Sequence, residues 1–497
     1  MASDVRRPVH ACRGLFALAI TVAVLVGLAS AQPVVVLSPK DGPPTTTLRV
    51  SGSGFTPYSQ IDIYFDSQDQ ALVVADAAGA FSQIAIQAPK SAVPGNHWVT
   101  AAERSGHLVK QEIFEVHVNW TEFLTQDMRR ENPYENVLSV DNVGSLEKRG
   151  MGKTGSYIFS GPAVVDGVVY VATEDGKVYA FNLSPRGLLW VYNTGRGRIW
   201  GSPAVVNGVL YIGSEDGNLY ALDAKTGTKL WSSPVGRVIV ASPVVVEGVV
   251  YVGSHAVDAS TGTELWSYPA KSDSTPAVAH GVVYIYSDDD GNFYALDART
   301  GTKLWSFAIG QQASDSIVAN GVVYVGAGSG NVYALDARTG AVLWSSSPTG
   351  DNFHRGSPAM ANGVLYIGSG YTGVYALDAQ TGTVLWKYAI DSEMQSSPAV
   401  ANGVVYIGGG FWTGGDFDSF KLYALNASTG ALLWSYQTDS NVSSSPAVAN
   451  GVVYVGSEDR HIYAFGLPKK LAPQAPKRPD PKALRPDFNL KPVSTTE

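Results

Sequence analysis

Short runs of alternating apolar and polar residues, separated by turn residues, fill the chain from residue 32 to about 118. Examples are QIDIYF at 60–65, FSQIAIQ at 81–87 and IFEVHV at 113–118. A period of two places every second side chain on the same face of a β-strand. About six or seven such strands predict a β-sandwich over residues 32–118.

From residue 160 onward the pattern becomes a repeat of roughly 40 residues. One copy, from Ser202 to Trp231, reads SPAVVNGVLYIGSEDGNLYALDAKTGTKLW. Four runs of strand length are visible in it, and the first two are separated by an x-Gly pair, which is typical of a two-residue hairpin. The eight x-Gly pairs are Asp166-Gly167, Asn207-Gly208, Glu247-Gly248, His280-Gly281, Asn320-Gly321, Asn362-Gly363, Asn402-Gly403 and Asn450-Gly451. Repeats of this kind predict an all-β, eight-bladed β-propeller of four-stranded blades, preceded by the small sandwich.

The last repeat stops at HIYAFGL (461–467), before its Trp, so its fourth strand has to come from elsewhere. About one repeat before Trp190 lies the segment SLEKRGMG, which has the place of a fourth strand without its first three. We expect a strand at about 145–151 to complete the last blade and to close a ring over residues 145–467. Residues 119–144 are then a linker or entry segment.

Both ends of the chain differ in composition from the repeats. Three Arg residues precede an apolar run at 14–29, and the triplet Ala29-Ser30-Ala31 follows it. This order predicts a signal peptide at 1–31 and an exported, extracellular or periplasmic (cell-envelope) protein; an uncleaved membrane anchor is the alternative. The tail at 468–497 is rich in Pro and Lys, and we expect it to be disordered.

Charge and cysteine content exclude several classes of protein. The single cysteine, Cys12, precedes the apolar run, so the mature chain is expected to contain no disulfide and no cysteine nucleophile or ligand. Acidic side chains outnumber basic ones by 43 to 35, and many of the basic ones lie near the two ends. We therefore expect no nucleic-acid partner, and no stable membrane span after signal cleavage.

The repeats resemble those of quinoproteins, the pyrroloquinoline-quinone-like (PQQ-like) propellers. The pattern Ala-x-Asp-x-x-x-Gly-x-x-x-Trp, seen at Ala221, Asp223, Gly227 and Trp231, is similar to their tryptophan-docking motif. The resemblance implies that these indoles pack between neighbouring blades as structural residues. The seven candidates are Trp190, Trp231, Trp266, Trp305, Trp344, Trp386 and Trp434.

The N-terminal turns carry a second resemblance. SGSGFTP (51–57), DAAGAFS (76–82) and PGNHWVTAAE (94–103) are similar to turns of bacterial immunoglobulin-like domains of the IPT/TIG kind. This similarity implies an Ig-like sandwich that acts as a spacer or a second contact. Its motifs are structural, because each Gly serves a turn or a bulge.

The resemblance to quinoproteins raises the question of a cofactor. Members of that family bind PQQ at the axis beside Ca²⁺, and they commonly carry adjacent cysteines over the ring. No segment of this chain matches their catalytic Asp or their metal ligands, and the acidic turns are explained as Asp-Gly turns. We therefore predict no catalytic residue, no metal and no cofactor, with PQQ plus Ca²⁺ as the alternative.

The least regular loops lie on one face of the expected ring, where aromatic and charged residues gather. Such loops on a rigid scaffold are typical of recognition surfaces. The candidate ligand or partner residues are Arg196, Arg198, Trp200, Phe353, His354, Arg355, Phe411, Trp412, Asp416 and Asp418.

These observations favour a non-enzymatic, extracytoplasmic binding or scaffold protein whose loop face holds a protein, small-molecule or glycan ligand. One alternative is a PQQ-dependent oxidoreductase acting on alcohols or sugars, and another is carbohydrate or cell-wall adhesion. The repeats also resemble the propeller component of outer-membrane assembly machinery. Because the lipoprotein signal usual in that family is missing, its role is not carried over.

Overall fold

The computed structural model describes residues 32–106, 108–125, 128–183, 187–195, 197–236, 238–348, 352–353, 356–390, 394–410 and 420–493. The expected signal peptide at 1–31 lies outside these residues. Apart from two 3-10 turns, η1 (Val143–Ser145) and η3 (Pro481–Ala483), all regular elements in the described part are strands, which confirms the all-β prediction. Within the same residues, no helix has the length and apolarity that crossing a membrane requires.

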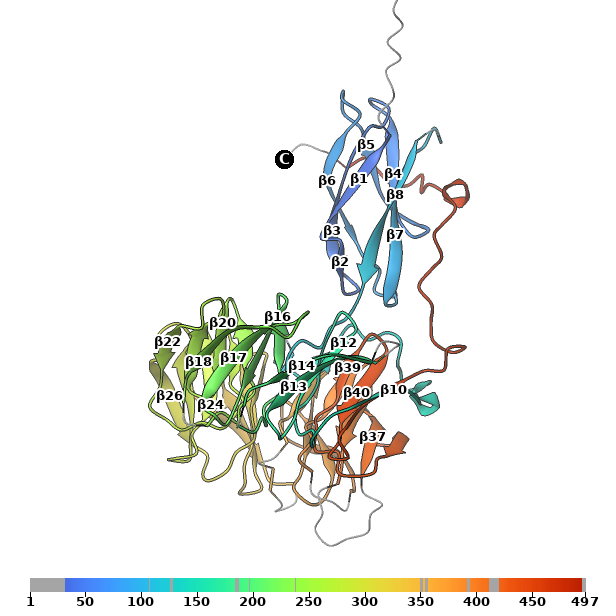
Figure 1. Cartoon of the computed structure of the whole chain (residues 1–497). Coiled ribbons are helices and arrows are strands. Elements are labelled where there is room, and N and C mark those ends of the chain that lie inside the picture. The colour runs from blue at the N-terminus through green and yellow to red at the C-terminus, as the bar shows by residue number, and fades with distance from the viewer. Residues whose placement is uncertain are drawn as a thin grey trace, which may run out of the picture.

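The N-terminal unit consists of two sheets packed face to face (Figure 1). One has the order β1-β3-β6 and the other the order β2-β8-β7-β4-β5. Inward side chains such as Leu48, Ile63, Val99 and Phe114 form its core. The strands are β1 (Val34–Ser38), β2 (Asp41–Gly42), β3 (Thr47–Ser53), β4 (Gln60–Phe65), β5 (Gln68–Val74), β6 (Phe81–Gln87), β7 (Gly95–Glu103) and β8 (Val109–Val116).

Eight further sheets follow, each with a first, second, third and fourth strand; the seventh sheet also includes the short strand β9 (Glu131–Asn132), and the last takes its fourth strand, β10, from before the first repeat. The first strands are β11 (Ala163–Val165), β15 (Ala204–Val206), β19 (Val244–Val246), β23 (Ala277–Ala279), β27 (Ile317–Ala319), β31 (Ala359–Ala361), β35 (Ala399–Ala401) and β39 (Ala447–Ala449). The second strands are β12 (Val168–Ala172), β16 (Val209–Gly213), β20 (Val249–Val252), β24 (Val282–Tyr286), β28 (Val322–Gly326), β32 (Val364–Gly368), β36 (Val404–Gly408) and β40 (Val452–Gly456). The third strands are β13 (Lys177–Asn182), β17 (Asn218–Asp223), β21 (His255–Asp258), β25 (Asn292–Asp297), β29 (Val332–Asp336), β33 (Val374–Asp378), β37 (Lys421–Asn426) and β41 (His461–Gly466). The fourth strands are β14 (Gly187–Asn193), β18 (Lys229–Pro234), β22 (Glu264–Ser267), β26 (Lys303–Ala308), β30 (Val342–Ser346), β34 (Val384–Tyr388), β38 (Leu432–Gln437) and β10 (Glu147–Lys153).

The sheets stand around a common axis, which Figure 1 shows as a ring below the N-terminal unit. Each first strand contacts the first strand of the next sheet, and β39 contacts β11. The last sheet has the order β10-β41-β40-β39, so a strand from before the first repeat supplies its outer position. The ring therefore has no open end between its first and last sheets.

The hairpin that opens each repeat depends on its x-Gly pair. In the second sheet Asn207 has φ 51° and Gly208 has φ 78°, and the other pairs have the same signs. Positive φ at both central residues is the type I′ geometry that matches the twist of antiparallel strands. The short first strands of Ala and Val fit the crowded axis.

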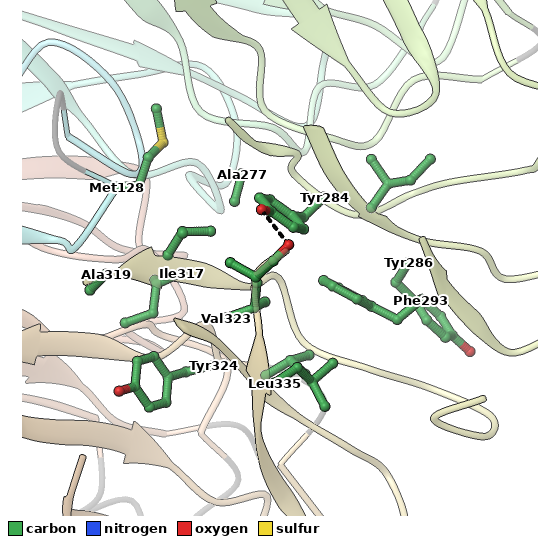
Figure 2. Packing of buried hydrophobic residues seen from close by; sticks show 14 of the residues in the cluster. Met128, Ala277, Tyr284, Tyr286, Phe293, Ile317, Ala319, Val323, Tyr324 and Leu335 are labelled. Atoms are coloured by element: carbon green, nitrogen blue, oxygen red, sulfur yellow. Dashed lines mark hydrogen bonds between the residues drawn. The ribbon is translucent and has the colours of Figure 1, made fainter. Parts of the chain in front are cut away.

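Neighbouring sheets are joined by the repeat-end indoles. Trp305 Nε1 donates to the carbonyl of Ala337 in the next sheet at 3.1 Å, and its ring lies against Gly340. The hydroxyl of Tyr284 donates to the same carbonyl at 2.9 Å; Figure 2 shows this bond within the apolar core around Ile317, Val323 and Leu335. Corresponding indole bonds to the next sheet are made by Trp190, Trp231, Trp266, Trp344 and Trp386.

The seventh sheet departs from this pattern. Trp434 Nε1 donates to the carbonyl of Leu146, just after η1, because the last sheet lacks the docking turn. The hydroxyl of Tyr406, which is fully buried, has no hydrogen-bond partner among the residues that the structure describes, whereas its counterpart Tyr366 donates to Ala427 at 3.1 Å. Burial raises the pKa of Tyr406 well above its usual value, so the phenol stays neutral.

Two matched substitutions test this difference. Tyr366→Phe should lower the free energy of unfolding by about 1 kcal/mol, because it removes a made hydrogen bond. Tyr406→Phe should leave stability unchanged or raise it by up to about 1 kcal/mol, because it removes an unsatisfied hydroxyl. Urea unfolding followed by tryptophan fluorescence measures both. Equal losses of stability in the two variants would show that the Tyr406 hydroxyl is hydrogen-bonded as well.

The C-terminal segment differs from the expectation of a disordered tail. Residues 468–493 run back from the ring along the N-terminal unit, seen in red in Figure 1. Arg478 Nε donates to Gln111 Oε1 at 2.6 Å, and Val493 N donates to the carbonyl of Leu72 at 2.8 Å. The composition of the tail alone suggests disorder, because it does not reveal that the sheet of the N-terminal unit supplies contacts for the tail.

Candidate functional site

A belt of eight residues surrounds the axis of the ring, one from the start of each repeat; seven carry short polar side chains, and Gly161 contributes its backbone N–H. Its members are Gly161, Ser202, Ser242, Thr275, Asp315, Ser357, Ser397 and Ser445. In much of the belt, a backbone N–H donates to the hydroxyl of the next sheet: Gly161 to Ser202 at 2.8 Å, Ser202 to Ser242 at 2.9 Å and Ser357 to Ser397 at 2.9 Å. These hydroxyls therefore hold neighbouring sheets in register at the channel wall.

Asp315 is the one carboxylate in this belt. Its Oδ1 accepts the N–H of Thr275 at 2.7 Å, and its Oδ2 accepts the hydroxyl of Ser357 at 3.1 Å. Burial raises the pKa of Asp315, while these bonds and the charge of Arg130 lower it in part. The carboxylate lies at the bottom of the channel, enclosed by protein but still in contact with the cavity.

The entry segment plugs the end of the channel that faces the N-terminal unit. The N–H of Val205 donates to the carbonyl of Thr121, and the N–H groups of Met360 and Val400 donate to the carbonyls of Arg129 and Arg130. The short strand β9 (Glu131–Asn132) adds to β35 in parallel. The plug therefore contacts the first strands of several sheets, and the cavity ends against it.

Arg130 is the centre of the plug. Its guanidinium donates to the carbonyls of Phe123 at 2.5 Å and Pro398 at 2.8 Å, and it lies 4.3 Å from the centroid of the Phe123 ring. Burial lowers the pKa of Arg130 to about 9, an effect that the charge of Asp315 opposes. The side chain remains a cation at neutral pH and compensates the carboxylate above it.

Glu122 is a second buried ionisable residue of the plug. Its Oε2 accepts the N–H of Val245 at 3.1 Å, and burial raises the pKa of its carboxyl to about 8. A carboxyl whose pKa is raised on folding stabilises the fold fully below its unfolded pKa, and this contribution is lost as the pH rises to the folded value. Between about pH 4.5 and 8 the plug therefore loses stability.

The variant Glu122→Gln tests this sign. We expect it to gain about 3–4 kcal/mol relative to the unchanged protein between pH 5 and pH 8, because glutamine has no proton to lose. Thermal unfolding at both pH values measures the gain. The matched control is Glu147→Gln, which makes the same substitution on the exposed surface. A constant difference between the two proteins would contradict a buried, protonated Glu122.

The opposite end of the channel opens into a cavity of about 540 Å³. Phe159 and Trp200 line its rim with their ring centroids 4.8 Å apart, and the indole Nε1 donates to Glu215 Oε1 at 2.7 Å. Asp273 and Asp288 lie in the same lining, joined by a bond from the Asp273 N–H to Asp288 Oδ2 at 2.9 Å. The cavity and the belt together form a funnel with an aromatic rim and a polar floor.

The structure places three of the predicted face residues. Trp200 lines the funnel, and Arg198 lies beside it, 3.5 Å from Glu174 and largely exposed. Phe353 is fully buried and packs on Tyr375 with ring centroids 5.8 Å apart, so its assignment to a ligand face is wrong. The remaining candidates lie outside the described residues: Arg196, His354, Arg355, Phe411, Trp412, Asp416 and Asp418.

Sequence reasoning missed the belt, the plug and Phe159. Asp315 had a readable signal, because the fifth repeat has Asp-Ser where the second has Ser202-Pro203. Arg130 had none, because its partners come from segments that are distant in the sequence.

The closed ring of repeats, its docked indoles and its axial funnel define a PQQ-like β-propeller. A family model described as outer membrane protein assembly factor BamB matches residues 87–255, 235–355, 329–419 and 408–467. These matches cover more than half of the chain, and the protein belongs to that family.

Solved structures with similar folds include the quinohemoprotein alcohol dehydrogenase of Comamonas testosteroni, with TM-score 0.58, 17% identity, and coverage of 72% of this chain and 82% of that one. The quinohemoprotein alcohol dehydrogenase ADHIIG of Pseudomonas putida HK5 has TM-score 0.57 and 18% identity, with coverage of 74% and 82%. The computationally designed Ika8 protein has TM-score 0.57 and 16% identity, with coverage of 65% and 100%. No curated protein matches the chain. At these identities the likeness shows the fold alone.

The funnel can be tested against the PQQ alternative through its donor set. PQQ is a tricarboxylate, so a binding site needs basic side chains or cations that offset its charge. The described lining instead presents Asp273, Asp288 and Asp315, and it includes no Lys or Arg. No group of three or more His, Cys, Asp or Glu in the described chain could hold a metal ion. The described residues do not fit PQQ with Ca²⁺.

Proposed function

We propose that the protein is an exported, non-enzymatic binding protein that holds a segment of a protein partner in the funnel of its propeller. The observation that carries the proposal is the blind funnel, with the pair Phe159 and Trp200 at its rim and a floor closed by the plug. A rigid aromatic rim over a polar floor is typical of recognition sites.

The chemistry of the floor supports binding over catalysis. Hydroxyls such as those of Ser202 and Ser397 each accept a backbone N–H from the neighbouring sheet, and Asp315 is held by two donors. Groups engaged in such bonds position the wall, and they are not activated as nucleophiles or bases. The matching family model is named after an outer membrane protein assembly factor, and a role in protein assembly favours a protein as the partner.

The N-terminal unit supports the same proposal as a spacer. Its order β1-β3-β6 against β2-β8-β7-β4-β5 divides the strands between two sheets as in immunoglobulin-like sandwiches. We infer an Ig-like unit on the plugged side of the ring. The funnel then opens away from this unit, and a partner reaches it without contacting the spacer.

A photo-crosslinking amino acid placed at position 200 tests the proposal in cells that export the protein. We expect a discrete protein adduct from position 200. The matched control is position 304, because Leu304 is 52% exposed on the outer strand β26 and should give no such adduct. Adducts of equal yield from both positions, or none from position 200, would overturn the proposal.

The oxidoreductase alternative has its own readout. Purified protein is titrated with PQQ and Ca²⁺, while cofactor absorbance and dye-linked oxidation of alcohols and sugars are recorded. We expect neither saturable binding nor turnover, because carboxylates line the described funnel. A one-to-one complex with turnover would show that the protein is an oxidoreductase and would overturn the proposal of a non-enzymatic binding protein.

A further inference from the structure

In the N-terminal unit, the outer face of the sheet β2-β8-β7-β4-β5 is covered, although the side chains on this face point away from the core of the unit. Ile61 and Ile63 lie in that core, so Asp62 between them points outward, yet Asp62 is only 1% exposed. Thr100 on β7 and Gln111 on β8 point to the same outer side, and they are 0% and 7% exposed. Polar residues on a free outer face would be in contact with solvent, so another segment must cover them.

The first part of the cover is Arg478 of the C-terminal segment. Its guanidinium lies 4.9 Å from the ring centroid of Trp98, and its Nε donates to Gln111 Oε1 at 2.6 Å. Gln111 Nε2 in turn donates to the carbonyl of Pro479 at 3.1 Å and to the hydroxyl of Thr100 at 3.0 Å. The Arg478 guanidinium and the carbonyl of the residue after it are thus bound by one aromatic ring and one carboxamide.

A second set of contacts follows further along the same segment. Arg104 binds Asp62 at 2.9 Å, and it also donates to the carbonyl of Asp487 at 3.2 Å. The Arg104 guanidinium lies 5.4 Å from the centroid of the Phe488 ring. The N–H of Asp487 donates to Asp69 Oδ2 at 2.7 Å.

The last described residues of the segment lie on the free edge of the sheet. Pro492 forms a parallel bridge with Leu72 of the edge strand β5, and Val493 N donates to the Leu72 carbonyl at 2.8 Å. Main-chain bonding at an edge combined with side-chain pockets on the face is the way in which sheets recognise extended peptides. The segment therefore occupies its sheet in the manner of a bound peptide.

We infer that this outer face is a peptide-docking surface for an extended, basic segment with an arginine at the place of Arg478, and that residues 474–493 are its resident occupant. A partner segment with the same chemistry binds by displacing them. This site lies on the N-terminal unit and is separate from the funnel, so it goes beyond the proposed function.

The experiment uses a fluorescent peptide of residues 474–493 and two forms of the protein, the full chain and a chain ending at residue 473. The last strand ends at Gly466, so the shortened chain keeps every sheet. Fluorescence anisotropy should show saturable binding to the shortened chain. Binding to the full chain should be at least about tenfold weaker, because a tethered occupant competes at a high effective concentration.

Two matched peptides test the recognition. Arg478→Ala should weaken binding about tenfold, since it removes the contacts with Trp98 and Gln111. Arg485→Ala is the control with the same charge change, because Arg485 donates to carbonyls of its own segment, those of Lys482 and Leu484, and it should bind as the unchanged peptide does.

Further outcomes decide the assignment. Trp98→Ala in the shortened chain should weaken the unchanged peptide and leave the urea midpoint of the ring unaltered. Equal loss with both Arg variants would mean charge attraction alone and would overturn the specific recognition of Arg478. A full chain that is dimeric and becomes monomeric on shortening would place the segment on a second copy. No binding to the shortened chain would overturn the docking surface itself.

Discussion

Replacing Arg130 with methionine should lower the free energy of unfolding of the ring by about 3–5 kcal/mol, because a buried cation that bridges several elements is removed. Its guanidinium binds the carbonyls of Phe123 and Pro398 and faces Asp315, which would be left as an uncompensated buried charge. Urea unfolding, followed by tryptophan fluorescence, measures the loss.

Its neighbour provides the control. Arg129 donates to Asn320 Oδ1 at 3.1 Å and is only half-buried, so Arg129→Met should cost less than about 1 kcal/mol. Adding Asp315→Asn to Arg130→Met should recover part of the loss, because the remaining charge is neutralised. The same loss in both single variants would show that the plug does not depend on the buried cation.

Removing a docking indole should have the next largest effect. Trp305→Ala should cost about 3 kcal/mol, because it empties the contact with Gly340 and removes the bond to the Ala337 carbonyl. The measurement is the thermal or urea transition of the ring. Trp305 also packs 5.9 Å from Tyr284 between ring centroids, so the loss extends into the core between two sheets.

Substitutions at two glycines distinguish the energetic effect of the docking contact from that of backbone strain. Gly340 and Gly321 have φ of 72° and 77°, but a Cβ at Gly340 would lie 2.5 Å from the Trp305 ring, whereas one at Gly321 meets nothing within 4 Å. Gly321→Ala should cost about 1 kcal/mol from backbone strain alone, and Gly340→Ala clearly more. In a Trp305→Ala background the excess should vanish. Additive losses would contradict direct docking.

The ring could be predicted from the sequence because the same turn residues and strand patterns recur in all eight repeats. A pair such as Asn207-Gly208 predicts a hairpin turn wherever it recurs, and all eight pairs adopt positive φ. The place for a fourth strand near Gly150 could likewise be read from the spacing, and β10 pairs with β41 there. Local chemistry and periodicity carried this part of the fold.

The site was less readable because its contacts join segments that are distant in the chain. Arg130 binds the carbonyl of Pro398, and nothing near either residue in the sequence marks that bond. Phe353 was assigned to a loop surface by its aromatic and charged neighbours, yet it packs into the core on Tyr375. The tail was judged by its composition, whereas Arg478 finds its partners on another unit.

The pairing of β10 with β41 has a consequence for how the protein is made. Apart from the short β9, the outermost strand of the last sheet is synthesised before every other strand of the ring, and its partner is synthesised last. A chain that emerges with its N-terminus first therefore has β10 as an exposed strand edge until the final repeat has emerged. Any product that stops before residue 461 keeps that edge unpaired, so the ring closes only when the last repeat is complete.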